Sequence, residues 1–276
     1  MKPPLALLEH IDWKQFERVV ILSPHLDDAA LSCGGLLHAL QGRVSTLVVS
    51  ICCGTPRALA SDGARLPALR RGHVRPQYRR REDIAAMHSV NADFVHLSFP
   101  DGIYRRSPLT GKLIYRNERE RWIAPRIDDM AHIEELHLVL RRLCLDLGGI
   151  LLVSPMGIGQ HVDHQITAQV AVRLAAAGAP LLFYEDFPYV ADSRLGRGDQ
   201  GGPHAALAAL RLAPQRQFAL ALDVEAKMTL LRHYTSQVPI LFGDEDGMRS
   251  RIAGRCNGDV ASEFYWQAGP LAAVPP

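Results

Sequence analysis

A short polar motif, Ser23-Pro24-His25-Leu26-Asp27-Asp28, directly follows an apolar run of four residues and precedes a segment that can form a helix. The run, Val19–Leu22, is typical of a buried strand. Pro24 disfavours a helical conformation at the residue before it, so the strand ends there. One histidine and two adjacent carboxylates therefore stand where a strand ends and a helix begins. In open α/β sheets, ligands bind at this edge, outside the carboxyl ends of the strands.

The spacing within this motif indicates a metal ion. His25 and Asp28 are three residues apart, so one turn of helix would bring them to the same face, with Asp27 pointing elsewhere. Two carboxylates this close are costly to ionise together unless a cation lies beside them. The alternative is that one aspartate only caps the helix. A cap explains one carboxylate but leaves the second carboxylate and the histidine unexplained.

A second motif repeats this context further along the chain. Ser154-Pro155 follows the apolar run Ile150–Val153, and His161-Val162-Asp163-His164 stands at the entry to another predicted helix. A lone histidine is more often structural than a ligand, but two such clusters at strand ends of one parallel sheet are harder to explain that way. The two motifs together offer two imidazoles and a carboxylate, and the natural set is His25, Asp28 and His164. These donors suit a catalytic zinc ion, and iron or another divalent ion also fits.

Asp27 and His161 remain beside this metal site as free acid–base groups. Hydrolysis by a metal-activated water needs a base that takes the proton of the water and an acid that protonates the leaving group. The available groups therefore favour a hydrolase. Asp163 could then orient an imidazole by hydrogen bonding.

Apolar runs and periodic segments alternate along the chain, and strand–helix–strand units favour a parallel sheet. Strands are expected at residues 19–23, 44–53, 94–99, 150–153, 180–184 and 218–222, and helices at 28–40, 79–91, 128–147, 162–177 and 224–233. Irregular segments are expected at 54–78, 103–125 and 195–203. We expect an α/β, Rossmann-like fold: a mostly parallel sheet flanked by helices, in one domain over residues 1–276, with a mixed C-terminal extension.

Composition excludes several classes of protein. Hydrophobic residues make up 47% of the chain and charged residues 22%, as in an ordinary globular protein. The net charge of +2 gives no broad basic face for nucleic acid, and no apolar stretch approaches the ~20 residues of a membrane span. The five cysteines are interpreted as reduced thiols, and the N-terminus lacks the apolar region of a signal peptide. We expect a cytoplasmic protein, with its oligomeric state left open.

The two motifs resemble the paired signature of the LmbE/PIG-L-type zinc deacetylases. The resemblance is carried by Pro24–Asp28 and His161–His164, each after a strand, and the C-terminal part of the chain is less telling. It implies a Rossmann-like fold and hydrolysis of an N-acyl group, usually on an amino sugar. His25, Asp28 and His164 match the metal ligands of that family, and Asp27 matches its general base. His161 matches the residue that stabilises the oxyanion or protonates the amine.

The same resemblance implies substrate contacts. Arg79, with Glu82, and Asp101 resemble family positions near the substrate pocket. The chain departs from the commonest family pattern at three positions where Pro, Glu and Pro are usual, namely Leu26, Ala29 and Val162. None of these is an expected ligand, so the departures bear on the substrate rather than on the metal site.

Two other functions remain open at this stage: an amidase acting on a non-sugar N-acyl metabolite, and a non-catalytic metal-binding protein of the same fold. Asp27 and His161 argue against the second, because neither folding nor metal binding needs them. The arginines between residues 70 and 81 form either a clamp for a phosphate or carboxylate of the substrate or a solvated surface. The expected partner is a small-molecule N-acyl amino sugar or related metabolite, with no nucleic acid and no membrane span.

Overall fold

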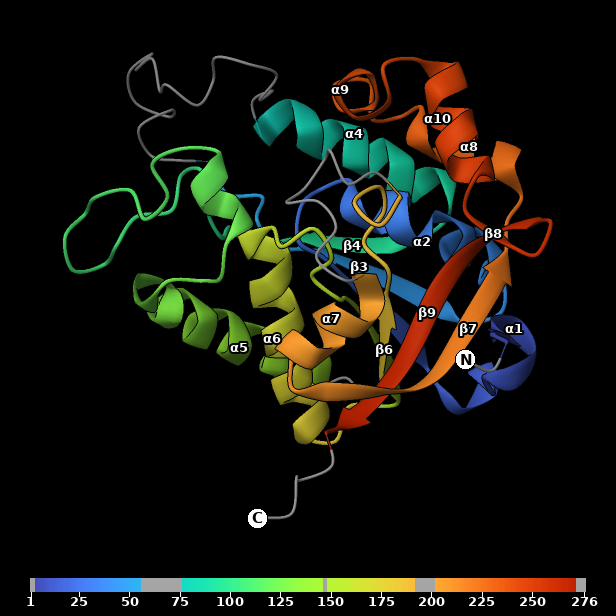
Figure 1. Cartoon of the computed structure of the whole chain (residues 1–276), viewed down its shortest axis with the longest axis horizontal. Helices are drawn as coiled ribbons and strands as arrows, with labels where there is room; N and C mark the ends of the chain where they lie inside the picture. The colour runs from blue at the N-terminus through green and yellow to red at the C-terminus, as the bar shows by residue number, and fades with distance from the viewer. Residues whose placement is uncertain (1–2, 56–75, 146–147, 192–201, 272–276) are drawn as a thin grey trace.

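The computed structural model describes residues 3–55, 76–145, 148–191 and 202–271 (Figure 1). The described strands form one sheet in the order β1-β7-β9-β6-β5-β2-β3-β4, and β8 pairs with β9 at its side. Their bounds are β1 Leu5–Ala6, β2 Arg18–Ser23, β3 Ser45–Ser50, β4 Asp93–His96, β5 Ile150–Pro155, β6 Leu181–Tyr184, β7 Leu212–Ala221, β8 Cys256–Asn257 and β9 Val260–Pro270.

The strands from β6 to β4 run parallel, as the sequence predicted. β9 is antiparallel to both β6 and β7, with Phe183 opposite Trp266 and Phe218 opposite Tyr265. The C-terminal segment therefore adds antiparallel strands to the sheet and makes it mixed. β9 was not predicted from the sequence because this strand buries Ser262 and Glu263, which interrupt the apolar pattern of a buried strand.

Helices cover both faces of the sheet (Figure 1). Their bounds are α1 Leu7–His10, α2 Asp28–Ala39, α4 Pro76–Ser89, α5 Met130–Leu145, α6 Val162–Ala176, α7 Gly202–Ala209, α8 Val224–Leu231, α9 Val238–Phe242 and α10 Glu245–Ala253, with short 3-10 turns at η1 Trp13–Gln15, η3 Arg119–Trp122 and η4 Ile127–Asp129. Most predicted helices are present within a few residues of the expected ends. α4 starts at Pro76 and not at residue 79, because proline is tolerated in the first turn of a helix.

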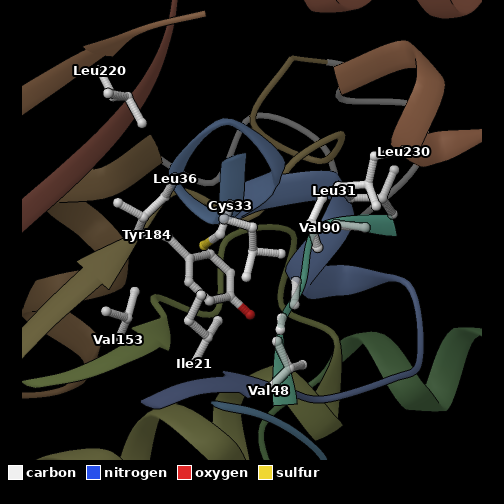
Figure 2. Packing of buried hydrophobic residues seen from close by; sticks show 14 of the residues in the cluster. Ile21, Leu31, Cys33, Leu36, Val48, Val90, Val153, Tyr184, Leu220 and Leu230 are labelled. Carbon is white, nitrogen blue, oxygen red and sulfur yellow. The ribbon is translucent and has the colours of Figure 1, made fainter. Parts of the chain in front are cut away.

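Alternate side chains of the parallel strands form two cores. Val19 and Ile21 of β2 pack toward α2 and α8, while Val20 and Leu22 pack toward α5 and α6. Figure 2 shows the first core, where strand residues meet Leu31 and Leu36 of α2 and Leu230 of α8. No helix among the described residues has the length and apolar character needed to span a bilayer.

The carboxyl ends of β2, β5 and β6 lie at the same edge of the sheet because these three strands are parallel neighbours. The two histidine motifs follow β2 and β5, and Glu185-Asp186 follows β6. The topology therefore brings together polar segments that are more than 100 residues apart in the chain, at the edge where α/β proteins bind ligands.

Candidate active site and metal centre

The loop after β2 is folded around the hydroxyl group of Ser23. This hydroxyl donates to the carbonyl oxygen of His25 at 2.6 Å and accepts from the backbone N–H of Ala29 at 2.9 Å. α2 begins only at Asp28, so His25 lies in the loop before the helix, and the prediction that one helical turn would join the two residues was wrong. Instead, Asp28 Oδ2 accepts from the His25 backbone N–H at 2.8 Å and lies 3.1 Å from His25 Nδ1.

The loop after β5 turns sharply before α6. Gly157 and Gly159 have φ angles of 84° and 83°, in the left-handed region that favours glycine. A Cβ atom at Gly159 would also lie 2.8 Å from the Cβ of Tyr189, so this position needs the close approach that only glycine allows. His161 then caps α6, because its Nδ1 accepts from the backbone N–H of Asp163 at 3.3 Å.

Asp28 lies between the two motifs. Its Oδ2 is 3.1 Å from Nδ1 of His25 and 3.2 Å from Nε2 of His164. Neighbouring ligand atoms in a tetrahedral zinc site with bonds of 2.0–2.1 Å lie about 3.3 Å apart. The Nε2 atom of His164 is buried and has no hydrogen-bond partner. This spacing and the unpaired nitrogen fit a divalent ion held by His25, Asp28 and His164.

Each of the two imidazoles has a second carboxylate behind it. His25 Nε2 lies 3.0 Å from Asp163 Oδ2, and His164 Nδ1 lies 2.7 Å from Asp186 Oδ1. Metal-binding histidines usually make such a contact with the nitrogen that does not bind the metal. The outer carboxylates therefore orient Nδ1 of His25 and Nε2 of His164 toward Asp28. Asp163, expected to orient an imidazole, contacts that of His25.

Two other groups of potential ligands occur within the described residues: His25, His161 and His164, and His25, Asp101 and Asp163, each with atoms within 4.8 Å of one another. These groups fit a metal less well. The Nδ1 atom of His161 already accepts a backbone hydrogen bond. Asp163 accepts from Arg105 at 2.6 Å and from the backbone N–H of Gly102 at 3.0 Å, in addition to its contact with His25.

Asp27 differs from Asp28 in its contacts. It stands at the start of α2 but makes no capping hydrogen bond. Its Oδ1 accepts from Nη2 of Arg79, on α4, at 2.6 Å, and both side chains are largely buried. Burial raises the pKa of Asp27, and the positive charge of Arg79 opposes that rise. Asp27 therefore lies beside the proposed metal site, and its carboxylate is paired with an arginine and not with a histidine.

The predicted arginine clamp is only partly described. Arg79 pairs with Asp27, and Arg80 donates to the carbonyl oxygen of Cys53 and to Thr55. The arginines at 70, 71 and 75 lie outside the described residues. The guanidinium of Arg79 already pairs with Asp27. Its role as a substrate contact stays a prediction.

The histidines differ in their electrostatics. Burial lowers the pKa of His25, but the bonds to Asp163 and Asp28 outweigh it and hold the pKa well above the usual value. The pKa of His164 is raised to about 9, because the charge of Asp28 and the bond to Asp186 outweigh burial. Burial holds the pKa of His161 well below its usual value. His25 and His164 thus lie in a negative environment that attracts a cation, whereas the His161 imidazole is neutral.

Comparison with known proteins identifies the family. Residues 20–175 match the family model PIG-L, described as GlcNAc-PI de-N-acetylase. The chain belongs to the PIG-L family. It is 30% identical over 274 residues to the 2'-N-acetylparomamine deacetylase of Streptomyces fradiae, a match that covers 93% of this chain and 91% of the relative. It is also 30% identical over 187 residues to the 2'-N-acetylparomamine deacetylase of Niallia circulans, covering 62% of this chain and 66% of the relative.

A solved structure supports the fold of this PIG-L protein. The zinc-inhibited form of the teicoplanin deacetylase Orf2 is 24% identical to it, with a TM-score of 0.75, over 93% of this chain and 99% of that one. The family membership confirms the resemblance seen in the two motifs. Family membership and the deacetylase relatives also confirm the prediction that this chain is an enzyme that hydrolyses N-acetyl amide bonds.

Several residues at the site were not identified from the sequence. Neither Asp186 nor Arg105 was identified as a partner of the metal-site residues. Trp122 and Tyr189 place their rings 4.9 Å from that of His161 and 5.4 Å from that of His164, respectively. Asp101, predicted near the substrate, has its Oδ2 3.8 Å from His25 Nε2. The sequence carries no local signal for these contacts, because each joins segments far apart in the chain.

Glu82, which the resemblance places near the substrate, contacts the segment after α8. Its carboxylate accepts from the hydroxyl of Thr235 at 2.7 Å and from the backbone N–H of Ser236 at 2.8 Å. Glu82 therefore joins α4 to the turn that follows α8.

Proposed function

We propose that this enzyme removes the N-acetyl group of an amino sugar or sugar-containing metabolite, using a divalent metal held by His25, Asp28 and His164. The observation that carries this proposal is the position of Asp28 between two imidazoles, 3.1 and 3.2 Å away. Each imidazole is backed by another carboxylate, as metal-binding histidines usually are. Three protein ligands would leave one position of a tetrahedral ion open for water or substrate. Zinc is the proposed ion, with Fe²⁺ the alternative.

A bound divalent ion supplies Lewis acidity, which polarises an amide carbonyl and makes water a better nucleophile at neutral pH. Asp27 takes the proton of the attacking water, since its carboxylate is next to Asp28 in the chain and is not a proposed ligand. Water adds to the carbonyl carbon, the C–N bond then breaks, and the proton passes to the amine. Acetate and the free amino sugar are the products.

His161 assists this reaction as a hydrogen-bond donor. Because its Nδ1 accepts from the Asp163 backbone N–H, the proton of the neutral ring is on Nε2. Nε2–H can donate to the carbonyl oxygen as negative charge develops there, or to the departing nitrogen. Asp163 and Asp186 hold His25 and His164 in place and do not touch the substrate.

The substrate class rests on the relatives, which act on an N-acetylated amino sugar, 2'-N-acetylparomamine. A small N-acyl amino sugar is therefore the proposed substrate. The cytoplasmic location, the single domain over residues 1–276 and the absence of a nucleic-acid partner stay predictions, and the oligomeric state stays open.

Metal analysis and acetate release test the proposed function together. The protein should bind about one zinc-class ion per chain and lose it in His164→Ala. The loaded protein should release acetate from a panel of N-acetyl amino sugars and not from N-acetyl amino acids. Full metal occupancy in His164→Ala would remove this residue from the ligand set. Release from the amino acids alone would indicate an amidase, and metal binding without release from either would indicate a non-catalytic protein.

A further inference from the structure

The side chain of Arg121, in the turn η3, lacks the partners that the other buried arginines of this region have. Only 9% of Arg121 is exposed. Its Nε is buried without an acceptor, and within the described residues its guanidinium takes part in no ion pair or hydrogen bond. Arg79 and Arg105, by contrast, contact Asp27 and Asp163 at 2.6 Å. A buried charge without a partner is costly, so this guanidinium is suited to bind an anion.

Arg121 lies beside the proposed active site. The ring of the next residue, Trp122, is 4.9 Å from that of His161. The carbonyl oxygen of Ile123 accepts from Gln165 Nε2 at 2.9 Å, which fixes the turn on α6. The position of Arg121 is therefore set by the same helix whose first turn carries His161, Asp163 and His164.

The electrostatics of the neighbouring side chains place the charge of Arg121 in the same region. Burial raises the pKa of Tyr104 and Tyr189 and lowers that of His161, and in all three the charge of Arg121 pulls the pKa down. These residues come from three segments, after β4, after β6 and before α6. The guanidinium thus lies within electrostatic range of all three side chains.

The carboxylates of the described site have other partners. Asp27 and Asp163 contact arginines, while Asp28 and Asp186 contact imidazoles. Asp101 accepts from the backbone N–H of Ile103 at 3.0 Å and lies 3.8 Å from His25. The described part of the chain therefore supplies no counter-ion in contact with Arg121, which leaves its guanidinium available to a ligand.

We propose that Arg121 binds an anionic group, a carboxylate or a phosphate, carried by the amino-sugar substrate near its N-acetyl group. This inference rests on the proposed deacetylase function and narrows its substrate class. The planar guanidinium matches the two oxygens of a carboxylate or phosphate. A substrate with a positive charge at that place is disfavoured by repulsion and by the lack of a counter-ion for Arg121.

A panel of N-acetyl sugars of different charge tests this proposal. The anionic members are N-acetylmuramic acid, with a carboxylate, and N-acetylglucosamine 1-phosphate and 6-phosphate. N,N'-diacetylchitobiose is the neutral member and mono-N-acetylchitobiose the cationic one. For the best anionic sugar, kcat/KM should exceed that of the neutral sugar by on the order of 10–100-fold, the usual worth of a charge-assisted pair. The carboxylate and phosphate members show which anion is used.

Arg121→Gln should reduce the ratio of anionic to neutral kcat/KM toward one, mainly through a higher KM, and Arg121→Lys should retain part of it. Arg119→Gln is the matched control, since Arg119 is exposed on the same turn. A wild-type protein with equal or greater preference for the neutral or cationic sugars would overturn the proposal. So would an Arg121→Gln variant that keeps the ratio of the wild type. If Arg121→Gln does not fold, the wild-type ratios and Arg121→Lys decide.

A binding measurement separates this proposal from the proposed function. Calorimetry with glucosamine and glucosamine 6-phosphate needs no turnover. Tighter binding of the phosphate that is lost in Arg121→Gln supports the role of Arg121 even if no sugar releases acetate, in which case the deacetylase proposal alone fails. Equal binding of the two sugars, together with equal kcat/KM across the panel, would show that Arg121 has a structural role only.

Discussion

The Asp27 carboxylate accepts a hydrogen bond of 2.6 Å from the Arg79 guanidinium, although 52 residues separate them in the chain. The contact joins the loop after β2 to α4. Asp28, the next residue, contacts His25 and His164 instead. Two chemically identical neighbours thus have different partners, and this difference supports the proposed division into a base and a metal ligand.

Replacing Arg79 should change the pH dependence of the enzyme. Asp27 acts as a base only when ionised, and the Arg79 charge lowers its pKa. Arg79→Gln removes that charge, so the pKa of Asp27 should rise. When the pH is lowered, the variant should therefore lose activity at a higher pH than the wild type does. The acidic limb of kcat/KM should move up by ~1–3 pH units, the usual effect of one neighbouring cation. A pH–rate profile at saturating metal measures this.

Arg80→Gln is the control for this experiment, because Arg80 donates to Cys53 and Thr55 and not to Asp27. The acidic limb of kcat/KM in Arg80→Gln should lie at the same pH as in the wild type. An equal shift in both variants, or no shift in Arg79→Gln, would show that Asp27 does not set the acidic limb.

The two neighbouring acids should respond differently to loss of charge. Asp28→Asn should weaken metal binding and lose activity as a consequence. Asp27→Asn should keep the metal but lose on the order of 10²–10⁴-fold in kcat, the usual worth of a positioned general base. Both variants must be assayed with metal in excess, and bound metal is measured by elemental analysis. If Asp27→Asn loses the metal and Asp28→Asn keeps it, the assignment is reversed.

The sequence predicted the central part of the site because its signals are local. Each motif combines a strand end, a Ser-Pro pair and a cluster of metal-binding side chains, and parallel pairing brings β2 and β5 together. Asp186 and Arg105 could not be predicted in the same way. Asp186 contacts a histidine 22 residues away and Arg105 an aspartate 58 residues away, and such pairs become visible only when the strands are placed.

The fold was predicted to a similar extent. The parallel strands are continuous apolar runs, which the sequence shows directly. β9 was missed because of Glu263, a carboxylate inside a buried strand that hydrogen bonds to α2 and α8. The expectation that a helical turn joins His25 to Asp28 was also wrong, since hydrogen bonds of Ser23 shape this loop before the helix starts.

Asp186 should set metal affinity more than chemistry. Its Oδ1 lies 2.7 Å from Nδ1 of His164 and its Oδ2 accepts from the backbone N–H of Ile158 at 2.9 Å. Asp186→Asn should weaken metal binding by about 10–100-fold, the usual effect of removing such a carboxylate. Activity should recover largely at saturating metal. Metal titration followed by kinetics measures both quantities.

Glu185→Gln is the matched control for Asp186, since it also neutralises a buried carboxylate after β6. Glu185 contacts Arg255 and Trp266 and no histidine of the site. Its metal affinity should equal that of the wild type even if its thermal stability falls. Weaker metal binding in both variants would indicate a general structural effect.

The cysteines should differ sharply in reactivity. Cys33, Cys53 and Cys144 are buried, and burial raises the pKa of each, to about 12 for Cys144, whereas Cys256 is exposed. The thiolate is the reactive form. Iodoacetamide at pH 8 should therefore label Cys256 first in the folded protein and all cysteines after denaturation, as read by mass spectrometry. Rapid labelling of Cys144 in the native protein would contradict the packing of α5.

The carboxylate of Glu263 joins three parts of the fold. It accepts from the backbone N–H groups of Gly35 and Leu36 at 2.8 and 3.1 Å, and from Nζ of Lys227 at 2.7 Å. The two backbone donors follow a break in α2 at Cys33, whose φ and ψ are −127° and 17°. Glu263 therefore caps the second half of the helix that begins with Asp28.

Glu263→Ala should lower the free energy of unfolding by about 3–5 kcal/mol, because it leaves Lys227 buried without its counter-ion. Glu245→Ala is the control, since Glu245 pairs with Arg232 at the surface and its loss should change the free energy of unfolding little. Urea denaturation of the metal-free protein measures both. Adding Lys227→Met to Glu263→Ala should recover part of the loss, because the uncompensated charge is removed. Equal losses for Glu263→Ala and Glu245→Ala would show that the buried pair of Lys227 and Glu263 does not hold α8 to β9.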